Sequence, residues 1–294
     1  MKNETFSGFH PIVNFVFFMA VLAMTMFIMH PVYLLISFIC GCAYLFYLKG
    51  RKGMAVQVGY LLPILVSMAI INPVFNHEGV TILFYLYNDN PVTLEAILYG
   101  LASAVMMGAS ILWFNCCNEV FTSDKIIYLF GRIIPSLSLM ISMTLRFVPR
   151  FKNYLQNVMR VQESLHKPES TKEKLAQALA AFSSTVSWAM EQSIVSADSM
   201  KSRGYGTARR SAYSIYRFEK RDGITLAVFV CLCIGAVLPC MLGATSWEFY
   251  PGLSGKLIGP IQSIAYICYS GACLTPLIID IKEDRKWNAL RSKI

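Results

Sequence analysis

Long apolar stretches constrain the fold of this chain more than any other feature. Six of them approach the roughly 20 residues that a helix needs to cross about 30 Å of hydrocarbon. Inside a bilayer the backbone must satisfy its own hydrogen bonds, and a helix does so within one segment. We therefore expect an all-α fold, a polytopic bundle of membrane helices. The six stretches are residues 10–29, 31–48, 54–75, 92–115, 223–246 and 258–281.

The composition supports a membrane protein and narrows its partners. Hydrophobic residues make up 55% of the 294 residues and charged residues only 15%, which is too apolar for a soluble domain of this size. The formal net charge of +9 then indicates basic loops beside anionic lipid, with no nucleic acid as partner. The nine cysteines lie in or beside the apolar stretches without zinc-like spacing, so we expect small buried side chains and no metal site.

The distribution of basic residues orients the predicted spans. Lys49, Arg51 and Lys52 follow the second stretch, Lys125 and a long basic run follow the fourth, and five more Lys or Arg residues follow the last. In the intervening loops, Lys256 is the only Lys or Arg residue. Because cytoplasmic loops carry the excess of Lys and Arg, we expect six spans in the plasma membrane with both termini in the cytoplasm.

Three local features complete the expected membrane topology. The dipeptide His30-Pro31 predicts a sharp turn between the first two spans, because proline lacks a backbone donor. Residues 79–87 are apolar but too short to span, and we interpret them as re-entrant or interfacial. Residues 125–145 are interrupted by an arginine and by Pro135, and we expect a broken or interfacial segment there.

Amphipathic sequence replaces apolar sequence between residues 146 and 222. This change divides the chain into an N-terminal membrane bundle (1–145), a long cytoplasmic helical arm (146–222), and C-terminal spans with a cytoplasmic tail (223–294). The first arm helix is predicted to begin at Pro149, since a proline in the first turn sacrifices no hydrogen bond, and to end near His166. Its predicted apolar face consists of Phe151, Leu155, Val158 and Leu165.

The second arm helix has clear start and stop signals. Ser170 and Glu173 form a capping-box pattern, and Gly204 stands where a left-handed terminating residue is wanted. A helix over residues 170–203 would be about 50 Å long at roughly 1.5 Å per residue. It cannot bury its own apolar stripe, so we expect it to pack against the first arm helix and another protein. The stripe consists of Leu175, Leu179, Phe182, Val186, Ala189, Ile194, Ala197 and Met200.

Two motifs in the arm carry a family resemblance. The stretch A-D-S-M-K-S-R-G-Y-G at residues 197–206 resembles the signature of the transmembrane T component of energy-coupling factor (ECF) transporters, a family that includes the cobalt-type permeases. Upstream, L-R-F-V-P at residues 145–149 resembles the start of that family's first coupling helix. The order of elements also agrees, so the resemblance covers essentially the whole chain.

The resemblance is incomplete at the end of the first arm helix. Members of the family carry a second arginine triplet there, after an Ala-Gln pair. Here Gln162 matches, but Leu165 stands where the arginine is expected, and Arg160 is the nearest cation that could replace it. The residues to which the resemblance assigns contact with a partner are Ala197, Asp198, Met200, Ser202, Arg203, Gly204, Tyr205, Gly206, Arg146, Arg160 and Gln162.

The resemblance implies a non-catalytic coupling subunit of an ECF-type ABC importer. It would join two ABC-type ATPase subunits to a small membrane protein, the S component, that captures a vitamin or a metal ion for uptake. Arg203 would enter a groove of an ATPase and pair with acidic side chains there. Without the resemblance, an arginine just inside a helix C-terminus lies near the negative end of the helix dipole and is available to a partner.

Two other functions compete with this reading. A conventional ABC permease subunit would form the substrate path itself and needs a cytoplasmic E-A-A-x-x-x-G loop. Glu95-Ala96-Ile97 with Gly100 matches this motif only weakly and is predicted to lie on the outer side of the membrane. A membrane-embedded enzyme would need titratable residues converging within the spans, and none is found. No ATP-binding P-loop or zinc-protease motif occurs, so we expect no enzymatic activity and no cofactor.

Overall fold

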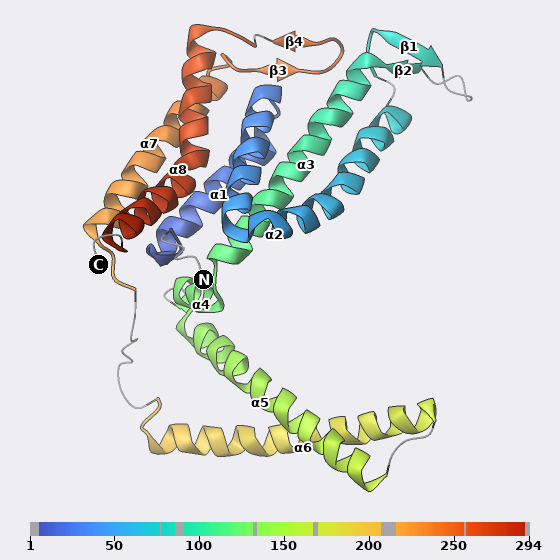
Figure 1. Ribbon diagram of the computed structural model, residues 1–294, viewed down its shortest axis with the longest axis vertical. Helices are drawn as coiled ribbons and strands as arrows, with labels where there is room; N and C mark the ends of the chain where they lie inside the picture. Colours follow the sequence, from blue (N-terminus) through green and yellow to red (C-terminus); the bar gives the residue numbers. More distant parts are fainter. Residues whose placement is uncertain are drawn as a thin grey trace. The chain divides into compact units, whose positions relative to one another are not determined.

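The computed structural model describes residues 6–76, 78–85, 91–131, 134–166, 170–206, 216–255 and 257–291 (Figure 1). Helices dominate these residues, and the only sheets among them are two short hairpins, so the all-α fold is confirmed. The chain forms two compact units. One, here called the bundle unit, contains residues 1–125 and 216–294, and the other, the arm unit, contains residues 126–215. These boundaries place the start of the arm earlier than the sequence suggested.

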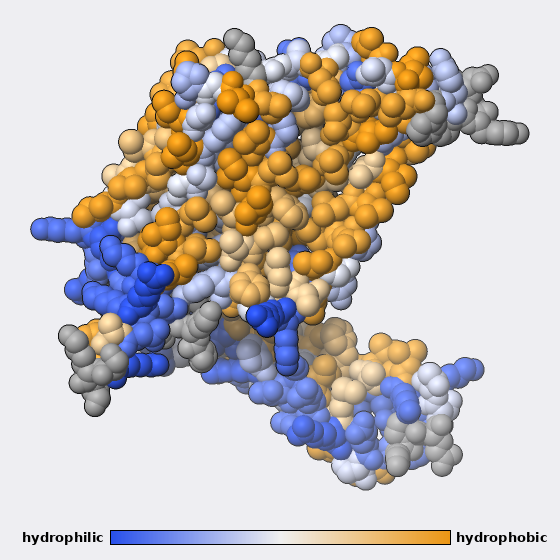
Figure 2. Space-filling view, turned by 45° about the horizontal axis from the view of Figure 1, so that its top comes forward, coloured by the Kyte–Doolittle hydropathy of each residue, from blue (hydrophilic) through white to orange (hydrophobic). Residues whose placement is uncertain are grey.

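The bundle unit contains the apolar helices. Four of its helices are long and apolar enough to cross a membrane, namely α2, α3, α7 and α8, and α1 is a shorter apolar helix. The visible sides of this unit are mostly hydrophobic (Figure 2). Its elements are η1 (Phe6–Gly8), α1 (Pro11–Phe27), α2 (Pro31–Phe75), β1 (Ile82–Tyr85), β2 (Pro91–Thr93), α3 (Leu94–Val120), α7 (Lys220–Met241), β3 (Trp247–Glu248), β4 (Ser254–Gly255) and α8 (Pro260–Arg291).

The second and third predicted spans both lie in α2, which bends sharply partway along its length (Figure 1). The bend is at Gly50, whose φ of 68° and ψ of −171° are not helical. Glycine reaches this positive φ at little cost because it has no Cβ. The turn predicted at His30-Pro31 is confirmed, since His30 caps α2 and its Nδ1 accepts a hydrogen bond from the Val32 N–H at 3.3 Å.

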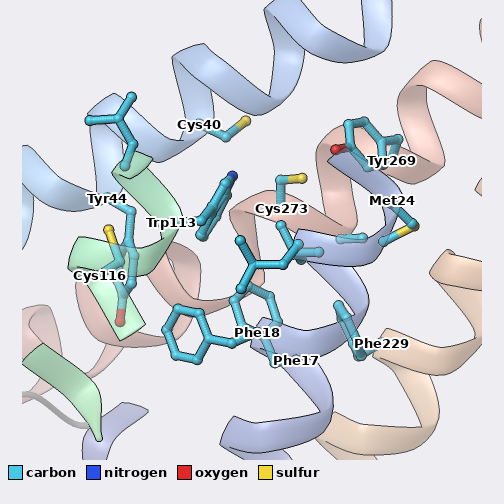
Figure 3. Packing of buried hydrophobic residues seen from close by; sticks show 14 of the residues in the cluster. Phe17, Phe18, Met24, Cys40, Tyr44, Trp113, Cys116, Phe229, Tyr269 and Cys273 are labelled. Atoms are coloured by element: carbon cyan, nitrogen blue, oxygen red, sulfur yellow. The ribbon is translucent and has the colours of Figure 1, made fainter. Parts of the chain in front are cut away.

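Aromatic and sulfur-containing side chains fill the core of the bundle unit (Figure 3). Phe17 and Phe18 of α1 pack around Trp113 of α3, and the ring centroids of Phe17 and Phe229 lie 5.1 Å apart. Cys40, Cys116 and Cys273 are buried free thiols, as expected for small apolar side chains, whereas Cys231 is exposed and the other five cysteines are partly buried.

A chain of polar contacts links four helices through this core. The Trp113 Nε1–H donates to Ser37 Oγ at 3.0 Å, and Ser37 Oγ lies 2.8 Å from Thr25 Oγ1. Thr25 Oγ1 in turn lies 3.3 Å from the Tyr269 hydroxyl. Polar groups in an apolar core are costly unless they are hydrogen-bonded, so these contacts favour one arrangement of α1, α2, α3 and α8.

Small residues allow α3 to approach α2 closely. A Cβ added at Gly100 would lie 3.1 Å from the Ala69 carbonyl oxygen, and one added at Gly108 would lie 2.9 Å from Leu65 Cδ2. Larger side chains at either position would therefore push the second half of α2 away. Such small residues are the usual means of close helix packing in membranes.

Charged residues from distant segments meet at one end of the bundle unit. Lys49 Nζ lies 2.8 Å from Glu119 Oε1, at the bend of α2 and the end of α3. The Phe6 N–H donates to Asp280 Oδ1 at 2.7 Å, which joins the N-terminal segment to α8. Segments predicted from their basic residues to share one side of the membrane thus lie at one end of this unit.

The other end of the bundle unit contains the two hairpins. Residues 82–85, which we had interpreted as part of a re-entrant or interfacial segment, form β1 and pair antiparallel with β2, while residues 86 and 87 lie outside the described part. The run Ile-Leu-Phe-Tyr has high β propensity, and β2 supplies a partner strand for it. The Thr81 N–H donates to both carboxylate oxygens of Glu95 at 3.3 Å, which fixes this hairpin to the first turn of α3.

The arm unit is built from two long helices, α5 (Pro135–Leu165) and α6 (Thr171–Ser202), and α4 (Ser123–Gly131) precedes them. The segment 125–145 is broken as predicted, because α4 ends at Gly131 and α5 begins at Pro135. The interrupting residue Arg132 lies outside the described part.

The predicted start of the first arm helix was wrong. Pro149 lies inside α5, which already runs from Pro135. Pro135 occupies the first turn, where its missing N–H costs nothing, whereas Pro149 forfeits a single internal hydrogen bond in a long helix. The predicted end is confirmed, since His166 is the C-cap.

Candidate functional site

Aromatic contacts hold α5 and α6 together. The rings of Tyr154 and Trp188 are stacked with centroids 4.3 Å apart and planes 3° apart. Phe151 meets the edge of Trp188 at 5.8 Å, and Phe147 stacks on Phe151 at 5.8 Å. Such aromatic pairs contribute about 0.5–1.5 kcal/mol each beyond the area they bury. The two helices are therefore joined by a specific contact near the middle of α5.

The face of α6 that packs on α5 is not the predicted apolar stripe. The buried residues of α6 are Ala181 and Thr185, which share one face with Trp188 at spacings of four and three. The stripe lies on another face, where Leu175, Leu179, Phe182 and Ile194 are each at least 60% exposed. The prediction that this helix packs against the first arm helix is confirmed, but the packing uses Trp188 and small residues rather than the apolar stripe.

The end of α6 forms the termination that Gly204 predicted. Gly204 has a φ of 79°, and its N–H donates to the Lys201 carbonyl at 2.9 Å. The Tyr205 N–H donates to the Met200 carbonyl at 3.0 Å, which completes a Schellman motif. The start is equally regular, with both bonds of the Ser170–Glu173 capping box present. Arg203 is consequently fixed as the C-cap residue, beside the negative end of the helix dipole.

A cleft lies between the first turns of α5 and the last turns of α6. Its volume is about 490 Å³. Arg146 of the L-R-F-V-P motif and Arg203 of the A-D-S-M-K-S-R-G-Y-G motif both line it, together with Met200 and Tyr205. Two motifs that are separate in sequence thus share one site. The remaining lining residues are Leu139, Met143, Phe147, Val195, Ser196 and Ser199.

The charge of this cleft has one sign. Among the described residues that line it, only Arg146 and Arg203 are charged, and both are exposed. The Arg146 guanidinium carbon lies 5.6 Å from the centroid of the Phe147 ring, a distance typical of a cation–π contact. Within the described part of the chain, neither arginine lies within 4.0 Å of a carboxylate. The cleft therefore presents two guanidinium groups that no described carboxylate pairs with.

The other predicted site residues lie outside the cleft lining. Ala197, Asp198, Ser202 and Gly206 are exposed around the end of α6, and Gly206 also has a positive φ of 93°.

Arg160 and Gln162 lie near the far end of α5, where Arg160 is exposed and Gln162 is partly buried. Neither residue lines the cleft, so the structure does not bring Arg160 to Arg203. At this end of α5, Leu165 is 83% exposed.

Sequence reasoning missed the apolar wall of the cleft. Leu139, Met143 and Phe147 recur every four residues on α5 and point to one face. That spacing is a readable signal, but it was hidden because the helix was expected to begin only at Pro149. Val195 lies off the predicted stripe of α6 and gave no comparable signal.

Within the described ranges, no three His, Cys, Asp or Glu side chains gather closely enough to hold a metal ion. No model of a known protein family matches the chain, and a search of curated proteins finds no match for it.

Proposed function

We propose that this chain is the transmembrane coupling subunit, or T component, of an ECF-type ABC importer. The observation that carries the proposal is the cleft that Arg146 and Arg203 both line, which has no acidic residue among its described lining residues. Both arginines belong to the motifs that resemble this family, and a cleft of this charge is suited to the acidic surface of a partner. The proposed partners of the chain are two cytoplasmic ABC-type ATPase subunits, one of which would bind at this cleft.

The construction of the arm unit supports a mechanical role. The stacked pair Tyr154 and Trp188 joins α5 to α6, so a displacement of one helix is passed to the other. In the proposed mechanism, closure of the ATPases on ATP moves the arm, and the arm reorients the S component, which then releases its vitamin or metal ion inside the cell. The chain itself supplies no catalytic group to this process.

The exposed stripe of α6 supports a second protein contact. Leu175, Leu179 and Phe182 lie on one face and are about 60% exposed each, at 63%, 61% and 60%. Contiguous apolar surface outside a membrane marks an interaction site. In the proposed importer this stripe is covered by a partner subunit rather than by water.

The environment of Glu95 argues against the permease alternative. A conventional permease would offer an acidic E-A-A loop to its ATPase, but Glu95 is only 4% exposed and lies in the first turn of α3. Its carboxylate accepts hydrogen bonds from Thr81. The Glu95 carboxylate is therefore buried and hydrogen-bonded to the hairpin, so it is not accessible to a partner protein.

Co-purification tests the proposal. The Arg203→Glu chain should insert into the membrane normally but no longer retain ABC-type ATPase subunits, because a carboxylate would repel the acidic partner. Arg150→Glu, at an exposed arginine of α5 outside the cleft, is the matched control and should retain them. Equal retention of the ATPases by wild type and Arg203→Glu would refute the proposed function.

A further inference from the structure

We propose that Arg146 and Arg203 form one seat for a single ATPase element, in which an acidic side chain is bound by both guanidinium groups and a neighbouring apolar side chain fills the cleft. This inference rests on the proposed function and adds a second cation and a partner chemistry to it. Arg146, and not Arg160, is then the arginine that assists Arg203.

The geometry of the two helices places both cations at the same end of the arm unit. Arg146 lies on α5 one turn after Met143 and two turns after Leu139, all of which line the cleft. On α6, Ser196, Met200 and Arg203 line it with spacings of four and three. Each helix thus contributes one guanidinium group to the same cleft, Arg146 beside Phe147 on α5 and Arg203 before Tyr205 at the end of α6.

The chemistry of the two cations selects a carboxylate. A guanidinium group has five N–H donors in a planar fork, and a carboxylate accepts two of them side by side. Arg146 and Arg203 both line the cleft, and none of its described lining residues is acidic, so a carboxylate that enters the cleft finds two cations there. A partner with one or more acidic residues gains from both cations, and a neutral or basic partner does not.

The apolar lining specifies the rest of the partner. Leu139, Met143, Phe147, Val195 and Met200 form most of the wall behind the arginines. A carboxylate alone would leave this wall in contact with water, whereas an adjacent apolar side chain would bury it at a gain proportional to the covered area. The fitting element is therefore an acidic residue beside a large apolar residue, on a loop or helix end of the ATPase.

A double-mutant cycle tests the shared seat. The full-length chain is purified in detergent, and its affinity is measured for the ATPase subunits that co-purify with the wild type. The variants are Arg146→Gln, Arg203→Gln and the combination, with Arg150→Gln as the control. We expect each single variant to weaken binding about tenfold or more, as for lost charge-assisted hydrogen bonds. The combination should weaken binding by much less than the product of the two effects, because both side chains serve one contact.

Two further measurements show whether a loss of binding comes from the cleft contact rather than from unfolding. The midpoint of thermal unfolding should be unchanged in all variants, since both arginines are exposed. Arg146→Lys, which keeps the charge but loses the planar fork, should bind with an affinity between those of wild type and Arg146→Gln.

The outcomes separate this inference from the proposed function. If Arg203→Gln weakens binding but Arg146→Gln behaves like Arg150→Gln, the shared seat is wrong and the proposed function stands. Independent, multiplicative effects of the two variants would also overturn the shared seat. If neither arginine matters, both proposals fail. If Arg146→Gln changes only the retention of anionic phosphatidylglycerol by the purified chain, the cleft is a lipid site and the inference is overturned.

Discussion

Tyr154 of α5 and Trp188 of α6 lie face to face, with ring centroids 4.3 Å apart and planes 3° apart. Because the ring of Phe151 also packs nearly perpendicular to that of Trp188, a single side chain of α6 contacts two aromatic residues of α5. This contact lies on the face of α6 that carries Ala181 and Thr185. It is the point through which one arm helix is held to the other.

Replacing Trp188 should loosen the arm. Trp188→Ala removes both aromatic contacts, each worth about 0.5–1.5 kcal/mol beyond the buried area. Hydrogen–deuterium exchange of the full-length chain in detergent should then be faster across the middle of α5 and α6. Trp287→Ala, at a 51% exposed tryptophan of α8, is the control and should leave exchange in the arm unchanged. Wild-type exchange rates in Trp188→Ala would show that other contacts hold the two helices.

The conformation of Gly204 predicts a graded set of variants. At a φ of 79° an ordinary L-residue costs about 1–2 kcal/mol, and asparagine is the best tolerated replacement. Gly204→Val should therefore fray the end of α6, displace Arg203 and weaken ATPase binding by roughly fivefold or more. Gly204→Asn should retain most of the binding. Equal binding by the valine and asparagine variants, measured as co-purified ATPase, would contradict this role.

Replacing Lys125, in the first turn of α4, should destabilise the protein. Its side chain is 3% exposed, and its Nζ donates to the carbonyls of Ser7 and Val120 at 2.5 and 2.7 Å. Lys125→Met would leave buried acceptors without this donor, at a cost of about 1–3 kcal/mol. The midpoint of thermal unfolding should fall in Lys125→Met and stay constant in Lys282→Met, at an exposed lysine of α8. Identical midpoints in the two variants would show that the buried lysine stabilises nothing.

Protonation of His30 should destabilise the folded protein in acid. Burial lowers the pKa of His30 below its usual value of about 6.5, because the side chain in the turn before α2 is 1% exposed and surrounded by Tyr33, Trp247 and Tyr266. The fold therefore favours the neutral ring. Its stabilising effect is complete above pH 6.5 and is lost as the pH falls from there through the folded-state pKa.

Thermal unfolding between pH 7.5 and 5 tests this dependence. His30→Asn keeps a capping side chain but cannot be protonated, so its unfolding midpoint should fall less in acid than that of wild type. All other titratable groups are the same in both proteins, so the quantity to compare is the difference between the two unfolding midpoints at each pH. His166→Asn, at an exposed histidine, should behave as wild type. Parallel pH profiles for wild type and His30→Asn would exclude this role.

The features that the sequence predicted well are those that depend on neighbouring residues. The capping box at Ser170, the terminator at Gly204 and the turn at His30-Pro31 are each determined within a few residues, and all three are present. The apolar stretches predicted apolar helices for the same reason, although the second and third share one bent helix and the first forms the shorter α1.

The features that were missed depend on pairing between distant segments. Pro149 alone fits a helix start, but the chain from Pro135 already forms the preceding turns of α5, so only one hydrogen bond is lost there. The face of α6 that packs on α5 contains Trp188, Ala181 and Thr185. Hydrophobicity alone favours the stripe of Leu and Phe residues over this face, so it could not identify the packed face. The shared cleft of Arg146 and Arg203 follows from that pairing and could not be read from either motif.

Site-specific photocrosslinking in living cells tests the central claim most directly. A photoreactive amino acid at Tyr205, which lines the cleft, should crosslink the chain to an ABC-type ATPase subunit that mass spectrometry identifies. The same amino acid at Asn157, on the exposed polar face of α5, should give little of this product. Abundant crosslinks at Tyr205 that contain lipid or other membrane proteins, but no ATPase, would contradict the account.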